Sequence, residues 1–210
     1  MIKLGLSPLK QSLTSQTGFL LISTIVGHAF SYLYLVVMGR ALGPEAFGIL
    51  GALVAIFLIT CLIGQALMVA IGTRIAEIRA KSGDLVAAGA FVRLGTRLSL
   101  LCLLPSLAFV VTSRPVASFF HLTSNGPVIL LGFSLSTALI LDVVMGLMQG
   151  RQEFRQLGIT GYLAAQGLKP VLAVIFVWVG WDLLGAVGAL LASTALAVGV
   201  GLLFIWKQLT

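Results

Sequence analysis

Charged side chains are scarce in this 210-residue chain, and acidic ones are the scarcest. Only 9% of the residues are charged, and six Asp and Glu stand against 13 Lys and Arg, for a formal net charge of +7. Hydrophobic residues make up 59% of the chain, and the mean hydropathy is +1.13. A soluble core of ordinary size cannot absorb this much apolar surface. The composition therefore predicts an integral membrane protein.

Cysteine and histidine are almost as rare. Cys61 and Cys102 fall in different apolar runs, and neither has a second Cys or His at metal-ligand spacing. His28 and His121 lie on separate segments without a nearby acidic partner, so the chain lacks the clustered groups that a membrane-embedded enzyme needs. We therefore expect no catalytic site, no metal and no cofactor.

Long apolar runs dominate what remains. A helix needs about 20 apolar residues to cross a bilayer, and six runs of about this size are separated by short polar breaks. The runs are 18–38, 47–71, 95–111, 128–148, 157–179 and 183–206. They predict an all-α integral membrane fold of six transmembrane helices with a short tail at 207–210.

The segment 1–17 carries Lys3 and Lys10 between leucines, which predicts a basic segment at the membrane surface. The apolar run that follows is too long for the core of a cleaved signal peptide.

The basic residues are unevenly distributed between the two sides of the predicted membrane. If the N-terminus lies inside, the outer loops keep only Arg40 and Arg114. The inner set is Lys3, Lys10, Arg74, Arg79, Lys81, Arg151, Arg155 and Lys207, with Arg93 and Arg97 near the inner end of the third run. This asymmetry satisfies the positive-inside rule and predicts cytoplasmic termini. The charges suit anionic membrane lipid, and because they are not interleaved with aromatic residues we expect no nucleic-acid partner.

A compact polar hinge, Gly39–Gly48, separates the first two runs. Gly43 permits the backbone angles of a tight reversal, Pro44 suits the first turn of a new helix, and Glu45 places a negative charge at that helix's N-terminus. The hinge therefore predicts a helical hairpin.

Four polar groups fall inside the predicted spans, where each is costly and hence a candidate binding residue: His28, Gln65, Asp142 and Lys169. Lys169 precedes Pro170, which predicts a kink beside a buried ammonium group. Asp142 lies on the preceding antiparallel span at a depth that differs by only about 8 Å. An ion pair between the two residues and a contact of each with substrate are both open. His28 and Gln65 are equally compatible with helix packing.

Arg93 and Arg97 are four residues apart and therefore share one helical face. Two guanidinium groups on one face suit a phosphate, whose oxygens accept paired hydrogen bonds. The alternative is that both side chains extend to the headgroups of the inner leaflet.

Two patches carry a resemblance to a known family. Arg40, Leu42, Gly43, Pro44, Phe47 and Gly48 match a loop of the form R-x-L-G-P-x-x-(F/Y)-G. The stretch Gly146–Phe154 is similar to a G-x-x-x-G-x-x-x-F turn after the fourth span. Both patterns resemble the polysaccharide and O-antigen flippases of the multidrug/oligosaccharidyl-lipid/polysaccharide (MOP) superfamily.

The resemblance implies two six-helix lobes around a cationic cavity, which move polyprenyl-pyrophosphate-linked oligosaccharides across the cell (inner) membrane by alternating access. This chain has the helices of one lobe. We therefore expect either the N-terminal half of a longer flippase or a homodimer of parallel copies. Arg93, Arg97 and Lys169 would then neutralise the diphosphate. A multidrug exporter, for which Asp142 would be the acidic group, and a transport-inactive accessory subunit are the alternatives.

Overall fold

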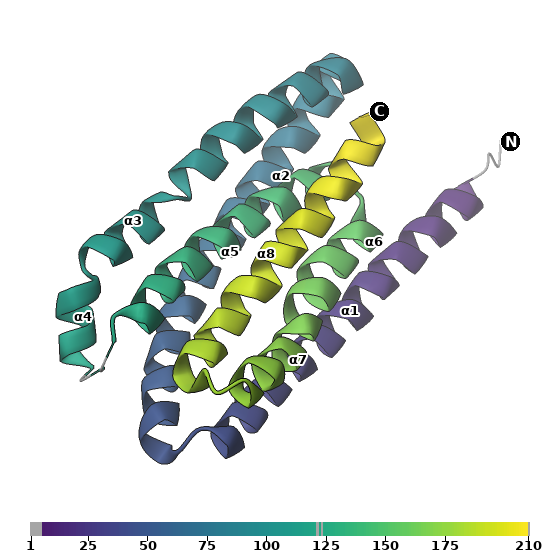
Figure 1. Cartoon of the computed structure of the whole chain (residues 1–210). Helices are drawn as coiled ribbons and strands as arrows, with labels where there is room; N and C mark the ends of the chain where they lie inside the picture. The colour runs from purple at the N-terminus through teal and green to yellow at the C-terminus, as the bar shows by residue number, and fades with distance from the viewer. Residues whose placement is uncertain (1–5, 121, 123, 210) are drawn as a thin grey trace, which may run out of the picture.

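The computed structural model describes the backbone of residues 6–120, 122 and 124–209, and the side chains of these residues except 6–15, 82–88, 90–92, 208 and 209. The described part of the chain is almost wholly helical and contains no strand. Its elements are α1 (Leu6–Ala41), α2 (Pro44–Leu101), α3 (Leu104–Val111), α4 (Ser113–Phe119), α5 (Gly126–Gly150), α6 (Phe154–Leu157), the π-helix η1 (Gly158–Ala164), α7 (Ala165–Trp178) and α8 (Asp182–Leu209). Figure 1 shows them as one elongated bundle.

Six helical segments in the described residues are long and apolar enough to cross a membrane, which confirms the predicted fold class. They are Gln16–Ala41, Pro44–Lys81, Arg93–Val111, Gly126–Gly150, Phe154–Trp178 and Asp182–Lys207. α1 begins at Leu6, so the described part of the predicted surface segment is helical and continues into the first span. Residues 1–5 of that segment, and His121, lie outside the described residues.

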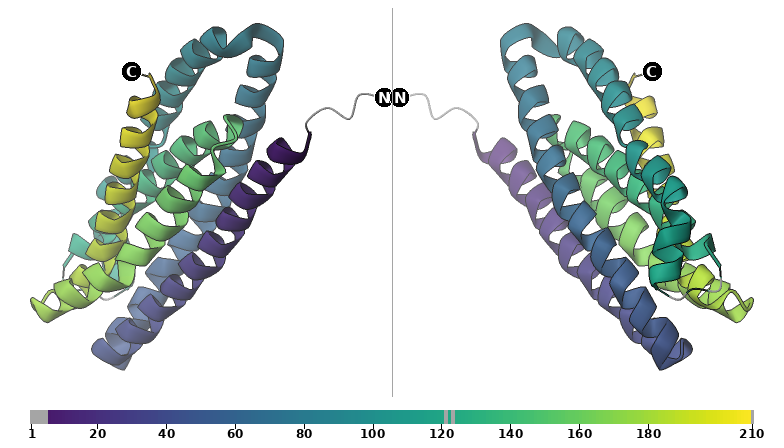
Figure 2. Two further views of the ribbon diagram at one scale, coloured as in Figure 1. Left: turned by 90° about the vertical axis from the view of Figure 1, so that its right-hand side faces the viewer. Right: turned by 90° about the vertical axis from the view of Figure 1, so that its left-hand side faces the viewer.

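The second and third spans belong to one helix, which differs from the expected polar break between them. α2 stays helical from Pro44 to Leu101, and its ribbon turns back on itself at the end of the lobe where α8 finishes (Figure 2). Residues 72–94 contain no proline and several alanines, so nothing in them removes helix hydrogen bonds. We call the part up to Lys81 the first limb of α2 and the part from Arg93 the second limb.

The hinge lies at the opposite end of the lobe, which we call the hinge end; the end where α8 finishes is the C-terminal end. Leu42 continues α1 by donating its backbone N–H to Met38 O at 2.9 Å, and α2 begins with Pro44 in its first turn. Gly43 has φ −62° and ψ 167°, which is ordinary extended backbone, so the expected use of glycine's conformational freedom was wrong. The proline and the extended residue before it are sufficient to separate the two helices.

α5 is the most buried span and lies at the centre of the lobe, between the two limbs of α2 on one side and α8 on the other (Figure 1). Its contact with the first limb of α2 depends on two glycines. A Cβ atom added to Gly146 would lie 2.7 Å from the carbonyl oxygen of Met68, and one added to Gly150 would lie 2.7 Å from Cβ of Ile75. The G-x-x-x-G pattern therefore lets two helix backbones touch, as small residues do in membrane bundles.

The replacement Gly150→Leu should lower the thermal unfolding midpoint in detergent by several degrees. A side chain there must push α5 away from the backbone of α2, and overpacking of this kind costs about 1–3 kcal/mol. Gly51→Leu is the matched control, because a Cβ at Gly51 meets no atom within 4 Å. Equal midpoints for the two variants would show that the contact between α5 and α2 does not limit stability.

Candidate functional site

A polar cavity of about 290 Å³ lies inside the lobe, among α1, the first limb of α2, α5, the η1–α7 span and α8. It brings together four of the six predicted site residues, His28, Gln65, Asp142 and Lys169, from four different spans. The other polar side chains that line it are Ser31, Tyr162, Gln166 and Thr194. We call this space the polar cavity.

Lys169 projects from α7 toward α1. Its Nζ donates a hydrogen bond to Ser31 Oγ at 3.2 Å, and Ser31 Oγ donates to Gln166 Oε1 at 2.5 Å. The same Nζ lies 5.9 Å from the centre of the Tyr34 ring, a separation at which the ring attracts a cation. Tyr34 is fixed in turn because its hydroxyl donates to Ala186 O at 3.0 Å. Every described partner of the ammonium group is therefore uncharged.

Asp142 lies on another wall of the polar cavity, against the first limb of α2. A Cβ atom added to Gly64 would collide with its carboxylate oxygen Oδ2 and come within 2.8 Å of its Cγ, so Gly64 provides the room for this side chain. Among the described residues the structure shows no ion pair between Asp142 and Lys169. The lysine stem runs toward α1 while the carboxylate rests on α2. The direct ion pair between Asp142 and Lys169, one of the two roles left open for them, is therefore not formed. A contact of each residue with substrate remains the other role.

The span that carries Lys169 contains an irregular turn, but this turn lies before Pro170 and not at the place where the proline predicts a kink. α7 continues through the buried Pro170, and the irregular turn is the π-helix Gly158–Ala164, which precedes α7. Gly161 in this turn packs against the side chain of Met145 on α5, so the wide turn lies against the wall of the polar cavity. π-Helical turns are rare and occur often at functional sites.

His28 and Gln65 lie where the polar cavity meets the surface, since both side chains are exposed. The His28 ring meets the edge of the Tyr162 ring with 6.2 Å between their centres. Cys61 also lines the polar cavity, and both cysteines are free thiols. Within the described residues no three His, Cys, Asp or Glu side chains gather as they would around a metal ion.

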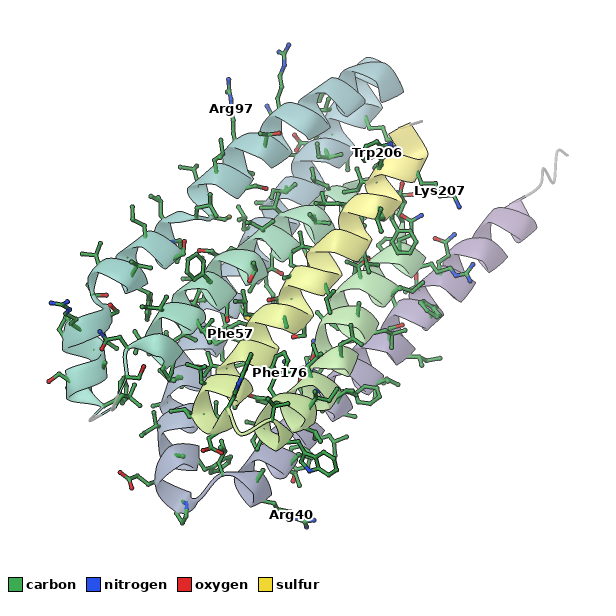
Figure 3. The ribbon with its side chains drawn as sticks, in the orientation of Figure 1. Arg40, Phe57, Arg97, Phe176, Trp206 and Lys207 are labelled. Atoms are coloured by element: carbon green, nitrogen blue, oxygen red, sulfur yellow. The ribbon has the colours of Figure 1, made fainter. Side chains whose placement is uncertain are left out.

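Arg93 and Arg97 do not reach the polar cavity. Both are exposed on the second limb of α2, and Figure 3 shows Arg97 pointing away from the lobe. Helical spacing correctly predicted that Arg93 and Arg97 lie on one helix. It could not predict that α5 stands between this part of the helix and the polar cavity.

Sequence reasoning missed three residues around the Lys169 ammonium group: Ser31, Tyr34 and Gln166. Uncharged polar residues are common in membrane spans, so they did not stand out. A signal for them exists in the spacing. Ser31 follows His28 by three residues and Tyr34 follows Ser31 by three, while Gln166 precedes Lys169 by three. Side chains at this spacing share a helical face.

Comparisons with known proteins agree with this architecture. Residues 13–210 match the family model described as "Polysaccharide biosynthesis protein". A solved structure titled "Outward-facing conformation of a multidrug resistance MATE family transporter of the MOP superfamily" superposes with a TM-score of 0.65 at 21% sequence identity. That match covers 93% of this chain and 46% of the solved chain, so this chain spans less than half the length of that transporter. No curated protein matches the chain.

The family model covers nearly the whole described bundle, and most of the bundle superposes on less than half of a full transporter. The chain therefore belongs to the polysaccharide biosynthesis protein family, and its fold is similar to that of part of the solved MATE transporter.

Proposed function

We propose that the chain forms half of a flippase that moves polyprenyl-pyrophosphate-linked oligosaccharides across the cell membrane, and that its polar cavity contacts the diphosphate. One observation carries the proposal: the Lys169 ammonium group in the polar cavity has only uncharged described partners. Family membership supports polysaccharide biosynthesis as the setting, and the likeness to a solved transporter supports transport as the activity.

The charge argument begins with the cost of placing an ammonium group inside a membrane protein. Such a group is retained where it pairs with another charge or serves a passing ligand. Lys169 has no carboxylate partner in the described structure, so an anionic ligand supplies the missing charge. A diphosphate offers several oxygens, which accept hydrogen bonds from the N–H groups of the ammonium that Ser31 does not use.

A second lobe, supplied either by a longer chain or by a second copy, would close the exposed side of the polar cavity. The superposition on 46% of a full transporter supports this arrangement. His28 and Gln65 would then face the space between the lobes, and rocking of one lobe against the other would alternate access to it.

Asp142 favours a second candidate function, export of cationic drugs. Its carboxylate belongs to the same cavity and has no ion pair with a described residue, so an organic cation is the ligand that this side chain would attract. The two functions make opposite predictions for the two charged residues.

The replacement Lys169→Met should weaken the binding of polyprenyl diphosphate to the purified chain by at least about tenfold, which corresponds to about 1.4 kcal/mol. The longer and permanently charged Lys169→Arg should retain most of the affinity. Lys81→Met is the matched control, since Lys81 is exposed and does not line the polar cavity. Isothermal titration in detergent measures all three, and unchanged affinity in Lys169→Met would contradict the diphosphate contact.

The replacement Asp142→Asn separates the two candidate functions. If the ligand is a diphosphate, removing the negative charge should leave its affinity unchanged or raise it, because the carboxylate repels phosphate. Tetraphenylphosphonium serves as the organic cation probe. Tight tetraphenylphosphonium binding that Asp142→Asn abolishes and Lys169→Met strengthens would establish the exporter and refute the flippase.

A further inference from the structure

The hydrogen bonds around the Lys169 ammonium group join three residues from two helices. Gln166 and Lys169 lie three residues apart on α7, and Ser31 meets both from α1. Lys169 Nζ donates to Ser31 Oγ at 3.2 Å, and Ser31 Oγ donates in turn to Gln166 Oε1 at 2.5 Å. We call these three residues the relay. Among the described residues, Ser31 Oγ is the one hydrogen-bond acceptor of the ammonium group.

The direction of the relay depends on Gln166. A serine hydroxyl has one proton to donate and two lone pairs with which to accept. Because the Ser31 proton goes to the amide oxygen of Gln166, the lone pairs of Ser31 are left for the ammonium group. Without that acceptor, the Ser31 hydroxyl would be free to turn to a carbonyl of its own helix, as serines inside helices do. Gln166 therefore fixes the side of Ser31 that Lys169 meets.

Close packing of α1 against η1 sets the register of the relay. A Cβ atom added to Gly27 would lie 3.0 Å from Cβ of Tyr162 and 3.1 Å from its carbonyl oxygen, so the two helices meet closely there. Ser31 follows Gly27, and Gln166 follows Tyr162, by about one helical turn. The hydroxyl and the amide are thus held opposite each other by packing that does not involve the ammonium group.

Gln166 supplies an acceptor that carries no charge. A carboxylate at position 166 would accept the same hydrogen bond from Ser31, but it would add a negative charge beside the ammonium group. The amide orients Ser31 and leaves the positive charge of Lys169 without a counter-charge in the relay.

Asp142 is the alternative partner of the ammonium group. It is the only carboxylate among the described residues that line the polar cavity, and Lys169 borders the same space of about 290 Å³. A lysine ammonium group sits on a flexible four-carbon stem, so it can be redirected without a movement of its helix. Opposite charges attract strongly in a protein interior, so an ammonium group that loses its acceptor turns to the carboxylate in the same cavity. The relay opposes this movement.

We propose that Gln166 is a positioning residue of the polar cavity: acting through Ser31, it holds the Lys169 ammonium group toward α1 and keeps it from pairing with Asp142. The relay thereby determines whether the polar cavity offers a positive charge to a ligand or contains an internal ion pair. The inference rests on the function proposed above for the identity of the ligand, a diphosphate.

A double-mutant cycle between Lys169 and Asp142 tests the proposal without any ligand. The thermal unfolding midpoint in detergent is measured for Lys169→Met, for Asp142→Asn and for the two together. In the otherwise unchanged chain we expect the two shifts to add, because the charges are not paired. In a Gln166→Leu background we expect a departure from additivity of about 3 °C or more, because each replacement then breaks an ion pair. Additive shifts in both backgrounds would overturn the proposal.

Binding of polyprenyl diphosphate to the purified chain gives a second measure. Gln166→Leu should weaken the affinity about tenfold, because the ammonium group is then paired with Asp142. Adding Asp142→Asn to Gln166→Leu should recover most of the lost affinity, since no carboxylate remains in the cavity to hold the ammonium group. A defect in packing alone would not be repaired by a replacement on α5. Affinity that stays tenfold weak in the combined variant contradicts the role of Gln166.

Ser31 provides matched variants on the other helix. Ser31→Ala breaks the relay and should reproduce both effects of Gln166→Leu, whereas Ser31→Thr keeps the hydroxyl and should leave both measures unchanged. Gln16→Leu makes the same chemical change as Gln166→Leu on α1, outside the polar cavity, and should alter neither measure. If Ser31→Ala behaves as the wild-type chain does, the relay does not hold the ammonium group, even where Gln166→Leu fails to fold.

These measurements separate failure of the positioning role from failure of the proposed function. If the wild-type chain does not bind polyprenyl diphosphate, the proposed function fails and the double-mutant cycle decides the role of Gln166. If the wild-type chain binds it and Lys169→Met weakens the binding, but Gln166→Leu binds as tightly as the wild-type chain, the proposed function stands and the role of Gln166 is refuted.

Discussion

The backbone contact between α5 and the first limb of α2 is the constraint on which the rest of the lobe depends. Gly146 and Gly150 allow the two helices to touch, and Gly64 leaves room in the same α2 limb for the side chain of Asp142. Because no hydrophobic driving force brings helices together within lipid, such close packing has to supply the attraction. With α5 held at the centre, one of its faces borders the polar cavity and the other borders a mostly apolar hollow between α5, the second limb of α2 and α8. A single packing contact thus separates a charged space from an apolar one.

The two charged residues of the polar cavity, Lys169 and Asp142, lie on different walls. This separation keeps them from pairing with each other. Lys169 is held toward α1 by Ser31 and by the ring of Tyr34, while Asp142 rests against α2. Had they formed a direct ion pair, each would have satisfied the other and the pair would have been mainly structural. Held apart, neither charge neutralises the other, and the ammonium group keeps N–H groups that can donate hydrogen bonds to phosphate oxygens.

The sequence predicts the spans well and the orientation of their faces poorly. Apolar runs of membrane length correspond to real helices because the bilayer leaves the backbone few alternatives. Polar groups inside a membrane protein lie beside other polar groups or water. This explains why one cavity contains His28, Gln65, Asp142 and Lys169. This reasoning does not apply to Arg93 and Arg97, because they lie in the first turns of the third span, where long side chains can reach the membrane interface. The continuous α2 was missed because the polar residues between its two limbs suggested a break, although they include no proline. The π-helix was missed because nothing in its composition distinguishes it from an α-helical turn.

Reaction of Cys61 with charged thiol reagents tests the central claim most directly, since this thiol lines the polar cavity and reports the local potential. In a Cys102→Ser background, the rate of an anionic methanethiosulfonate is divided by the rate of a cationic one of similar size. The account predicts that this ratio falls several-fold when Lys169 is replaced by Met, because the ammonium group attracts the anionic reagent. An unchanged ratio, or a Cys61 that reacts with neither reagent, would contradict an anion-attracting polar cavity.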